Sequence, residues 1–379
     1  MKILIVVTHL LGSGHLRRSI NLAQEFVACG HEVTLVSGGL PVKTFDSIGF
    51  TLVQLPPVSS DGTDFSRLLD QNSDIIDEHY LQARENKLCS LVTDLKPDVL
   101  ITELFPFGRR MLRDEFLGLL QAARTLPKVP VILSSVRDIL ATPSSDKKIR
   151  QTERIVAEYY DHVVVHSNAA TTPLSVSWPV SDQLQSKLYY TGYVGQSGGD
   201  YKSTSNNTEV VVSAGGGSVG RRVYETAVNA ARLTPDLQWR ILVGGQDAQT
   251  EVSRLQTLAK GTATIIEANR PDFRELLCQS ACSVSMSGYN TVIDLLLTGT
   301  PGVLIPFDAG GEKEQTLRAE SLSEHAAYTL LADKDLNPES LCSAVNQAAS
   351  AGRFSVDKKQ FNGALETVRF ATRLVQQKE

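Results

Sequence analysis

The 379-residue chain has no uninterrupted apolar run that approaches the roughly 20 residues a membrane helix needs. It also has no long Lys/Arg tract, and its formal net charge is -5. Proteins whose main partner is duplex nucleic acid usually carry a clustered basic surface. The sequence therefore argues against a membrane-spanning protein and against nucleic acid as a partner.

Cysteine is scarce, and a secretory leader is not evident. The five cysteines are an odd number scattered through the chain, whereas secreted disulfide frameworks use paired, closely spaced cysteines. The opening KILIVVTHLL is short, has one flanking charge and continues into GSGH instead of a small-residue cleavage site. We therefore predict a cytoplasmic protein whose first residues form a buried strand.

Strand patterns alternate with helical patterns along the whole chain, which is typical of parallel α/β sheets. The composition, 42% hydrophobic and 21% charged, is that of an ordinary globular protein. The segment GQSGGDYKSTSNNT contains almost nothing apolar and is predicted to be an interdomain linker. We predict an N-terminal domain (1–195), a linker (196–208), a C-terminal domain (209–356) and a terminal amphipathic helix (357–379).

A Ser-Gly-Tyr-Asn-Thr loop in the second half is typical of a phosphate site. Residues 284–286 read as a strand end, 287–291 as a tight loop, and 292–297 as a buried helix. Gly288 permits an unusual backbone angle in this loop. The first N–H groups of a helix are unpaired and carry roughly half a positive charge. We therefore predict that a phosphate binds at this helix start.

Three acidic or amide residues extend the predicted site. Asp294 lies one helical turn after Asn290, where its carboxylate can accept hydrogen bonds from two ribose hydroxyls. A short apolar strand then leads into the loop DAGGEKEQ, at the edge where ligands bind in open α/β sheets. Glu314 and Gln315 can bind sugar hydroxyls there. An ordinary βαβ unit with a polar loop is the alternative for any one of these residues.

Residues 283–315 resemble the donor-binding motif of GT-B type glycosyltransferases, and are similar to the family 28 (MurG-like) nucleotide-sugar transferases of bacteria. The resemblance implies two Rossmann-like domains that face each other across a cleft, with the C-terminal helix crossing back to the N-terminal domain. It also implies roles for seven residues. Diphosphate contacts are implied for Ser287, Gly288, Asn290 and Thr291, ribose contacts for Asp294, and donor-sugar contacts for Glu314 and Gln315.

Two departures from the family pattern leave the sugar open. Asp294 stands where Glu is usual, and Glu314 replaces an amide or an Asp. The resemblance further implies inversion at the anomeric carbon. We expect no metal and no cofactor, because helix dipoles and N–H groups are predicted to replace a divalent cation at the diphosphate.

Each half also begins with a strand, a glycine loop and a helix. In the second half, Gly216, Gly217 and Ser218 resemble the family loop beside the donor diphosphate, but the same stretch fits G-x-G-x-x-G. A nicotinamide-dependent oxidoreductase is therefore an alternative. In the first half, Gly12 and Gly14 allow close backbone approach, and Arg17 and Arg18 in the first helical turn predict a nearby anion.

His15 and Glu103 are the two candidates for the catalytic base. His15 follows the first glycine loop, and its ordinary pKa of about 6.5 suits proton removal from an acceptor hydroxyl. Glu103 ends a predicted strand, so it can orient His15 or act as the base itself. Other strand ends of the first half supply acceptor-side candidates, each of which has a structural salt bridge or loop cap as its alternative. These candidates are Arg137, Asp138 and His166.

Residues 105–123 have apolar positions ringed by arginines, as in helices that lie on anionic membranes. Packing of this helix on its own sheet is the favoured interpretation. A peripheral contact at the inner face of the membrane, with a lipid-linked acceptor, is the alternative to a small-molecule acceptor.

The most consistent function is transfer of a sugar from a nucleoside diphosphate sugar, with UDP as the expected nucleotide, to an unknown acceptor. A nucleotide-sugar epimerase or hydrolase of the same fold would turn over the donor without an acceptor. A non-catalytic sensor would bind the donor and leave it intact.

Overall fold

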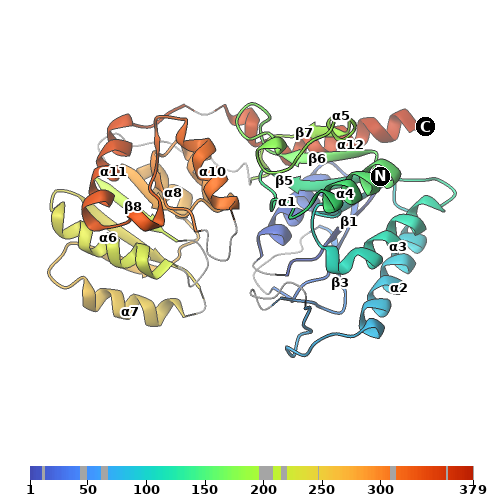
Figure 1. The fold of residues 1–379 in the computed structure, drawn as a ribbon, viewed down its shortest axis with the longest axis horizontal. Helices are drawn as coiled ribbons and strands as arrows, with labels where there is room; N and C mark the ends of the chain where they lie inside the picture. Colours follow the sequence, from blue (N-terminus) through green and yellow to red (C-terminus); the bar gives the residue numbers. More distant parts are fainter. Residues whose placement is uncertain are drawn as a thin grey trace. The chain divides into compact units, whose positions relative to one another are not determined.

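The protein forms two compact units in the computed structural model (Figure 1). Unit 1 comprises Met1–Gln196 and Lys359–Glu379, and unit 2 comprises Ser197–Lys358. The structure describes residues 1–10, 13–42, 49–60, 67–195, 208–214, 220–245, 247–307, 313–355 and 357–378. Each unit is an α/β structure built around one parallel sheet.

Unit 1 contains a seven-stranded sheet in the order β3-β2-β1-β4-β5-β6-β7. All neighbouring strands in it pair in parallel. The strands are β1 (Lys2–Val7), β2 (Glu32–Ser37), β3 (Thr51–Gln54), β4 (Val99–Glu103), β5 (Val131–Arg137), β6 (His162–His166) and β7 (Leu188–Tyr190). The strand order reverses direction between β1 and β4, which is the topological switch point of this sheet.

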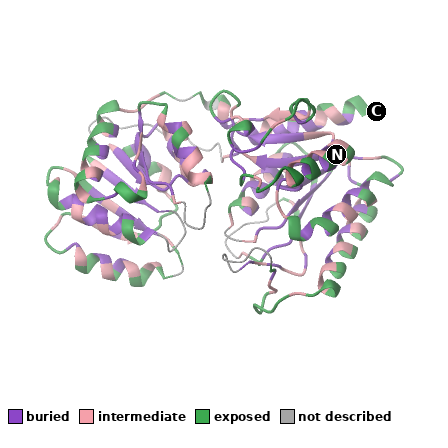
Figure 2. Ribbon diagram, viewed as in Figure 1, coloured by how far each residue is buried: buried purple, intermediate pink, exposed green. Residues whose placement is uncertain are grey.

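The central strands of unit 1 are apolar on both faces, because helices cover both (Figure 2). Leu4 and Val6 of β1 face a core shared with α2 to α5, whereas Ile3, Ile5 and Val7 face α1 and α12. The helices of this unit are α1 (Gly14–Ala28), α2 (Glu78–Leu95), α3 (Arg113–Arg124), α4 (Asp146–Tyr159), α5 (Asp182–Gln185) and α12 (Gly363–Lys378), with short turns η1 (Arg110–Leu112), η2 (Leu174–Val176) and η6 (Lys358–Phe361).

The C-terminal helix α12 packs on unit 1 beside α1, as expected. Phe370 stacks on Tyr189 of β7 with 3.6 Å between the ring centroids. Lys378 Nζ lies 2.8 Å from a carboxylate oxygen of Asp161, which precedes β6. The end of the chain therefore belongs to the core of the unit in which the chain began.

Unit 2 contains a six-stranded sheet in the order β10-β9-β8-β11-β12-β13, again with only parallel neighbours. The strands are β8 (Glu209–Ser213), β9 (Gln238–Val243), β10 (Ile265–Ala268), β11 (Cys282–Ser285), β12 (Gly302–Leu304) and β13 (Tyr328–Leu330). The switch point of this sheet lies between β8 and β11.

Helices cover both faces of the second sheet as well. One core joins the sheet to α6, α7 and α11, and the other joins it to α8, α9 and α10. These helices are α6 (Arg221–Leu233), α7 (Ala248–Leu258), α8 (Phe273–Gln279), α9 (Tyr289–Thr298), α10 (Glu314–Ser323) and α11 (Pro338–Ala351), with a short turn η5 (Asp333–Asp335). No described helix has the length and apolarity that crossing a bilayer requires.

The predicted fold class is confirmed, since both halves are parallel α/β units and the last helix returns to the first. The sequence pattern missed strand β7, because Leu188–Tyr190 is only three residues long. The interdomain cleft stays a prediction.

Candidate functional site

The predicted residues of unit 1 gather at its switch point. Glu103 is the last residue of β4, and His15 is the second residue of α1, which follows β1. Because β1 and β4 are hydrogen-bonded neighbours, their carboxyl ends place these two side chains together. His15 Nδ1 lies 2.8 Å from Glu103 Oε1.

This contact assigns the tautomer of His15. An ionised carboxylate only accepts hydrogen bonds, so Nδ1 donates its proton to Glu103, and Arg18 Nη2, which lies 3.1 Å from the same Nδ1, donates to Glu103 as well. The lone pair then belongs to Nε2, which is the nitrogen able to take a proton from a substrate. The His15 side chain is 12% exposed, whereas Glu103 is 1% exposed. His15 can therefore reach a ligand, and Glu103 is covered.

Two further side chains hold Glu103 in its ionised form. Arg18 is buried and pairs with Oε1, and Ser135 Oγ donates to Oε2 over 2.6 Å. Burial by itself would raise the pKa of Glu103, but the Arg18 guanidinium and the hydrogen bonds from His15 and Ser135 outweigh burial and lower it. Glu103 is thus a weak base that is suited to orienting His15.

Burial also sets the protonation of His15. Desolvation lowers its pKa, the hydrogen bond to Glu103 opposes this, and the positive charges of Arg109 and Arg137 lower it further. His15 is therefore neutral at physiological pH, which is the form that a general base requires, but the lowered pKa also makes it a weaker base than a solvent-exposed imidazole.

His166 lies behind this pair and is fully buried. Its Nε2 is 3.0 Å from Ser135 Oγ, and its Nδ1 is 2.9 Å from Thr191 Oγ1. In this arrangement His166 has no surface for an acceptor, in contrast to the contact expected from the sequence. It supports Glu103 through Ser135 instead.

The remaining candidates of unit 1 lie around the same sheet edge. Gly14 begins α1, Arg17 is exposed on it, and Gly12 lies outside the described residues. Arg137 ends β5 and is partly buried, whereas Asp138, the next residue, is buried.

Sequence reasoning missed the roles of two side chains of this region, Arg109 and His9. It placed Arg18 in the first turn of α1 beside an expected anion, and the structure pairs Arg18 with Glu103. Arg109 donates from Nε to the main-chain oxygen of Thr8, and no local pattern indicates that contact. His9 follows β1, and its Nε2 lies 3.0 Å from the oxygen of Leu40. A carbonyl only accepts, so His9 Nδ1 carries a lone pair, and this buried atom makes no hydrogen bond.

In unit 2, the predicted phosphate loop follows β11 at the second switch point. Helix α9 begins at Tyr289, three residues before the predicted start at 292, with Gly288 as its N-cap, and no side chain caps it. Asn290 is exposed and Thr291 is partly buried in the first turn. The helix start thus offers main-chain N–H groups to a ligand, as an anion site requires.

Arg318, which sequence reasoning also missed, joins the loop after β11 to α10. This buried residue donates from Nη1 to the oxygen of Ser287 over 2.8 Å and from Nη2 to Glu314 Oε1 over 2.8 Å. Ser287 Oγ donates to the main-chain oxygen of Gln315, and Gln315 Oε1 accepts from the N–H of Phe307. The residues predicted to contact diphosphate and sugar are therefore connected in one network.

Asp294, the predicted ribose ligand, lies on α9 and pairs with Arg274 of α8. Arg274 Nε is 2.6 Å from Asp294 Oδ1. The ion pair fixes the carboxylate against α8.

The family of this unit follows from comparison with known proteins. Residues 210–373 match the family described as "Glycosyltransferase family 28 C-terminal domain". This segment is thus similar to the C-terminal domain of family 28 glycosyltransferases. The recognition made from the Ser287–Gln315 segment is thereby confirmed, and the oxidoreductase alternative lacks support.

Curated relatives of the chain share one enzyme name. The chain is 29% identical over 136 residues to the UDP-N-acetylglucosamine–N-acetylmuramyl-(pentapeptide) pyrophosphoryl-undecaprenol N-acetylglucosamine transferase of Rhodospirillum rubrum, covering 35% of each chain. It is 33% identical over 133 residues to the enzyme of the same name from Methylobacterium radiotolerans, covering 33% of this chain and 36% of the other. The chain spans about a third of the length of these curated relatives.

Solved structures extend the likeness to both units at the level of the fold. MurG of Acinetobacter baumannii aligns with 98% of this chain and 100% of its own, at a TM-score of 0.65 and 14% identity. A UDP-glucosyltransferase from Polygonum tinctorium aligns with 99% of this chain and 94% of its own, at a TM-score of 0.65 and 11% identity. The fold is therefore GT-B.

The glycine loop predicted for the family 28 domain, with Gly216, Gly217 and Ser218, lies outside the described residues. In the sequence, this loop comes shortly after β8. Strand β8 pairs with β11, the strand that precedes Ser287 and α9.

The family 28 domain contains one Asp-x-Asp sequence, a spacing typical of metal-dependent transferases. It lies at Asp333–Asp335 in η5, where both carboxylates are exposed and Asp333 pairs with Arg222 at 2.8 Å. Within the described ranges, no group of three or more His, Cys, Asp or Glu residues is arranged to hold a metal ion.

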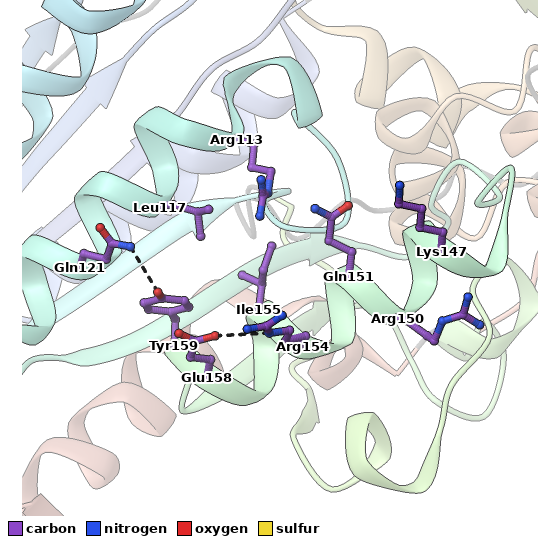
Figure 3. A pocket seen from close by; sticks show the side chains of 10 residues that line it. All are labelled: Arg113, Leu117, Gln121, Lys147, Arg150, Gln151, Arg154, Ile155, Glu158 and Tyr159. Atoms are coloured by element: carbon purple, nitrogen blue, oxygen red, sulfur yellow. Dashed lines mark hydrogen bonds and ion pairs between the residues drawn. The ribbon is translucent and has the colours of Figure 1, made fainter.

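A basic groove lies between α3 and α4 of unit 1 (Figure 3). Its lining includes four cationic side chains and one acid, and Arg154 pairs with Glu158. The apolar side chains of residues 105–123 mostly face the core, among them Phe107 and Phe116, whereas Met111 is 45% exposed. This helix therefore packs on its own sheet, which was the favoured interpretation.

Proposed function

We propose that the protein transfers a sugar from a nucleoside diphosphate sugar to an acceptor, with inversion and without a metal ion. Unit 2 binds the donor, and unit 1 supplies the acceptor side. One observation carries this proposal: the candidate residues of both sheets lie at the two switch points, where open α/β sheets bind ligands.

The donor assignment is supported by the family 28 domain and by the uncapped start of α9. The diphosphate binds the N–H groups of the Ser287–Thr291 loop together with the Gly216–Ser218 loop. Asp294 binds the ribose, and Glu314 with Gln315 binds the sugar. UDP is the proposed nucleotide, since the curated relatives are named as UDP-N-acetylglucosamine enzymes. A solved structure of similar fold, a spinosyn rhamnosyltransferase, is complexed with thymidine diphosphate, so dTDP is the second choice of nucleotide.

The reaction is a single in-line displacement. The acceptor oxygen attacks the anomeric carbon while its proton passes to His15 Nε2, and Glu103 stabilises the imidazolium that forms. The bond between the anomeric carbon and the diphosphate oxygen breaks, and the electron pair leaves with the nucleoside diphosphate. Preorganised N–H groups at the departing diphosphate can lower such a barrier by several kcal/mol.

Binding and turnover test this function separately. Thermal-shift titration with UDP-, GDP-, dTDP- and ADP-sugars should show stabilisation by one nucleotide class, because a ligand that binds only the folded state raises its stability. Stabilisation by none of the four would refute the donor site. Turnover of the bound donor without any acceptor would indicate an epimerase or hydrolase instead, and binding without turnover a sensor.

A further inference from the structure

A buried arginine of α10 reaches the start of α9, where the diphosphate is proposed to bind. The Arg318 side chain is 1% exposed. Its Nη1 donates to the oxygen of Ser287 over 2.8 Å, and its guanidinium carbon lies 5.8 Å from the centre of the ring of Tyr289, the first residue of the helix. Burying a charged group is costly unless the group is paired and hydrogen-bonded. The buried guanidinium is therefore held firmly against the helix start.

Ser287, the residue before the N-cap Gly288, is fastened to α10 through both its main chain and its side chain. Its oxygen accepts from Arg318, and its Oγ donates to the oxygen of Gln315 over 2.8 Å. Gly288 has no side chain that could fix the loop, and a Cβ atom at this position would meet no described atom within 4 Å. The direction of the first N–H groups of α9 therefore depends on how α10 holds Ser287.

Arg318 also connects this loop to a residue proposed to bind the sugar. Its Nη2 lies 2.8 Å from Glu314 Oε1, and the Glu314 side chain is 16% exposed. Glu314 lies four residues earlier on the same helix, a spacing that places two side chains on one face. One guanidinium thus contacts the main chain of the diphosphate loop and a carboxylate on the sugar side, while it is itself covered from solvent.

We propose, building on the sugar transfer proposed above, that Arg318 is a positioning residue of the donor site. It holds the main chain of Ser287 so that the N–H groups at the start of α9 point toward the diphosphate before the donor binds. A loop that is already ordered costs less entropy on binding than a loop that its ligand must order. Because Arg318 is covered, it acts through Ser287 and Glu314 and does not touch the donor.

Arg353 is the matched control, because it holds the opposite end of the same helix. It donates from Nη1 to the oxygen of Thr298 over 3.0 Å and from Nη2 to the oxygen of Ser280 over 2.7 Å. Thr298 is the last residue of α9, whereas the proposed diphosphate contacts lie at its start. Loss of an arginine that only stabilises the fold should lower the free energy of unfolding and leave the donor affinity of the folded protein unchanged.

The experiment measures UDP binding to the full chain by calorimetry and stability by urea unfolding. Arg318→Met replaces the guanidinium with an unbranched apolar side chain and should weaken UDP binding at least tenfold. Arg318→Lys should recover part of this affinity, because an ammonium can still donate to the oxygen of Ser287. Arg353→Met should be destabilised and bind UDP within twofold of the wild type. Wild-type affinity in folded Arg318→Met, or equal losses in Arg318→Met and Arg353→Met, overturns the proposal.

A double-variant cycle tests whether Arg318 acts through the loop after β11, and it uses Arg318→Lys so that it does not depend on the folding of Arg318→Met. Arg318→Lys and the double variant Asn290→Ala, Thr291→Ala should remove overlapping contacts. Their combined loss of UDP affinity should then be smaller than the product of the separate losses. Asp294→Asn changes a carboxylate that Arg274 holds on α8, so its loss should multiply with that of Arg318→Lys. Independent losses in both cycles would contradict the proposal.

Failure of the donor site itself gives a different result. A wild-type protein that binds none of UDP, dTDP, GDP and ADP refutes the donor site of unit 2 and the role of Arg318 with it. If dTDP, GDP or ADP binds in place of UDP, the same comparisons are made with that nucleotide. Binding by the wild type, with unchanged affinity in folded Arg318→Met and Arg318→Lys, keeps the donor site and refutes only the role of Arg318.

Discussion

The two switch points differ in how far their polar groups are satisfied within the protein. In unit 1, Glu103 is buried and held by His15, Arg18 and Ser135 before any ligand arrives. In unit 2, helix α9 begins without a side-chain cap, and its first-turn residue Asn290 is exposed. Side chains that the protein already orients, such as His15, can act on a reacting atom. An uncapped helix start, such as that of α9, can bind an anion through its free N–H groups. The comparison predicts that changes in unit 1 affect the rate and changes in unit 2 affect donor affinity.

The largest effect is expected from removal of the proposed base. His15→Ala should lower the maximal transfer rate by about 10²–10⁴-fold, the usual range for loss of general base catalysis, and leave donor affinity nearly unchanged. Steady-state kinetics with calorimetry of donor binding measures both quantities. A rate that survives in His15→Ala but collapses in Glu103→Gln would identify Glu103 as the base. Normal rates in both variants would refute the single displacement.

Glu103→Gln tests whether the buried network serves catalysis as well as stability. Removing one partner of a buried ion pair costs about 3–5 kcal/mol, because Arg18 is left uncompensated. Denaturant unfolding should show this loss, and the rate should also fall because His15 loses its orienting acceptor.

Glu115→Gln is the matched control for this variant. Glu115 pairs with Arg84 in the same unit, and both side chains are buried. Its loss should destabilise the protein by a similar amount and leave the transfer rate of the folded protein unchanged. Equal losses of rate in the two variants would mean that Glu103 acts only through the fold.

A smaller effect is expected in unit 2, where main-chain groups share the binding of the diphosphate. Asn290→Ala with Thr291→Ala should weaken nucleoside diphosphate binding by about 1–3 kcal/mol, the scale of lost charge-assisted hydrogen bonds. Calorimetry of the folded double variant checks this value. Unchanged affinity would remove the loop after β11 from the donor site.

The sequence predicted most of the fold and part of the site. The features that it missed are contacts between residues that lie far apart in the sequence. Strand periodicity and the rule that parallel strands end at one edge placed His15 and Glu103 together correctly. The partners of Glu103 were missed, because Ser135 lies 32 residues away in sequence and no spacing encodes their contact. Arg318 was missed for the same reason, since its bond to Ser287 depends on how α10 packs.

The backbone conformation at Arg109 and the ion pair of Asp294 could not be predicted from the sequence either. The left-handed turn that presents Arg109 occurs at a non-glycine residue, so no turn residue marks it. Asp294 carries the predicted carboxylate, but its ion pair with Arg274 follows from the packing of α8 against α9. The packing of α12 on unit 1 was predicted only from the resemblance to GT-B glycosyltransferases. An amphipathic pattern shows that a helix has an apolar face, but it does not show which part of the protein that face contacts.

The smallest effect per residue is expected in the pH dependence of stability, which should come mainly from unit 1. Burial lowers the pKa of His15 and of His166, so both stay neutral in the folded protein. In the unfolded chain they take up protons below about pH 6.5. The unfolded state then binds more protons, so stability should fall as the pH drops from 7 to 5, by about 1–2 kcal/mol for each histidine.

The variant His166→Gln provides the sharpest test of this linkage, because His166 is fully buried. Its free energy of unfolding should depend less steeply on pH between 7 and 5 than that of the wild type. His79→Gln changes an exposed histidine on α2 and should keep the wild-type slope. Measurements stay above pH 5, because the lowered pKa of Glu103 adds a second loss of stability at more acidic pH. Identical slopes for His166→Gln and the wild type would mean that His166 takes up its proton equally in the folded and unfolded states, and that the network around Glu103 is open to water.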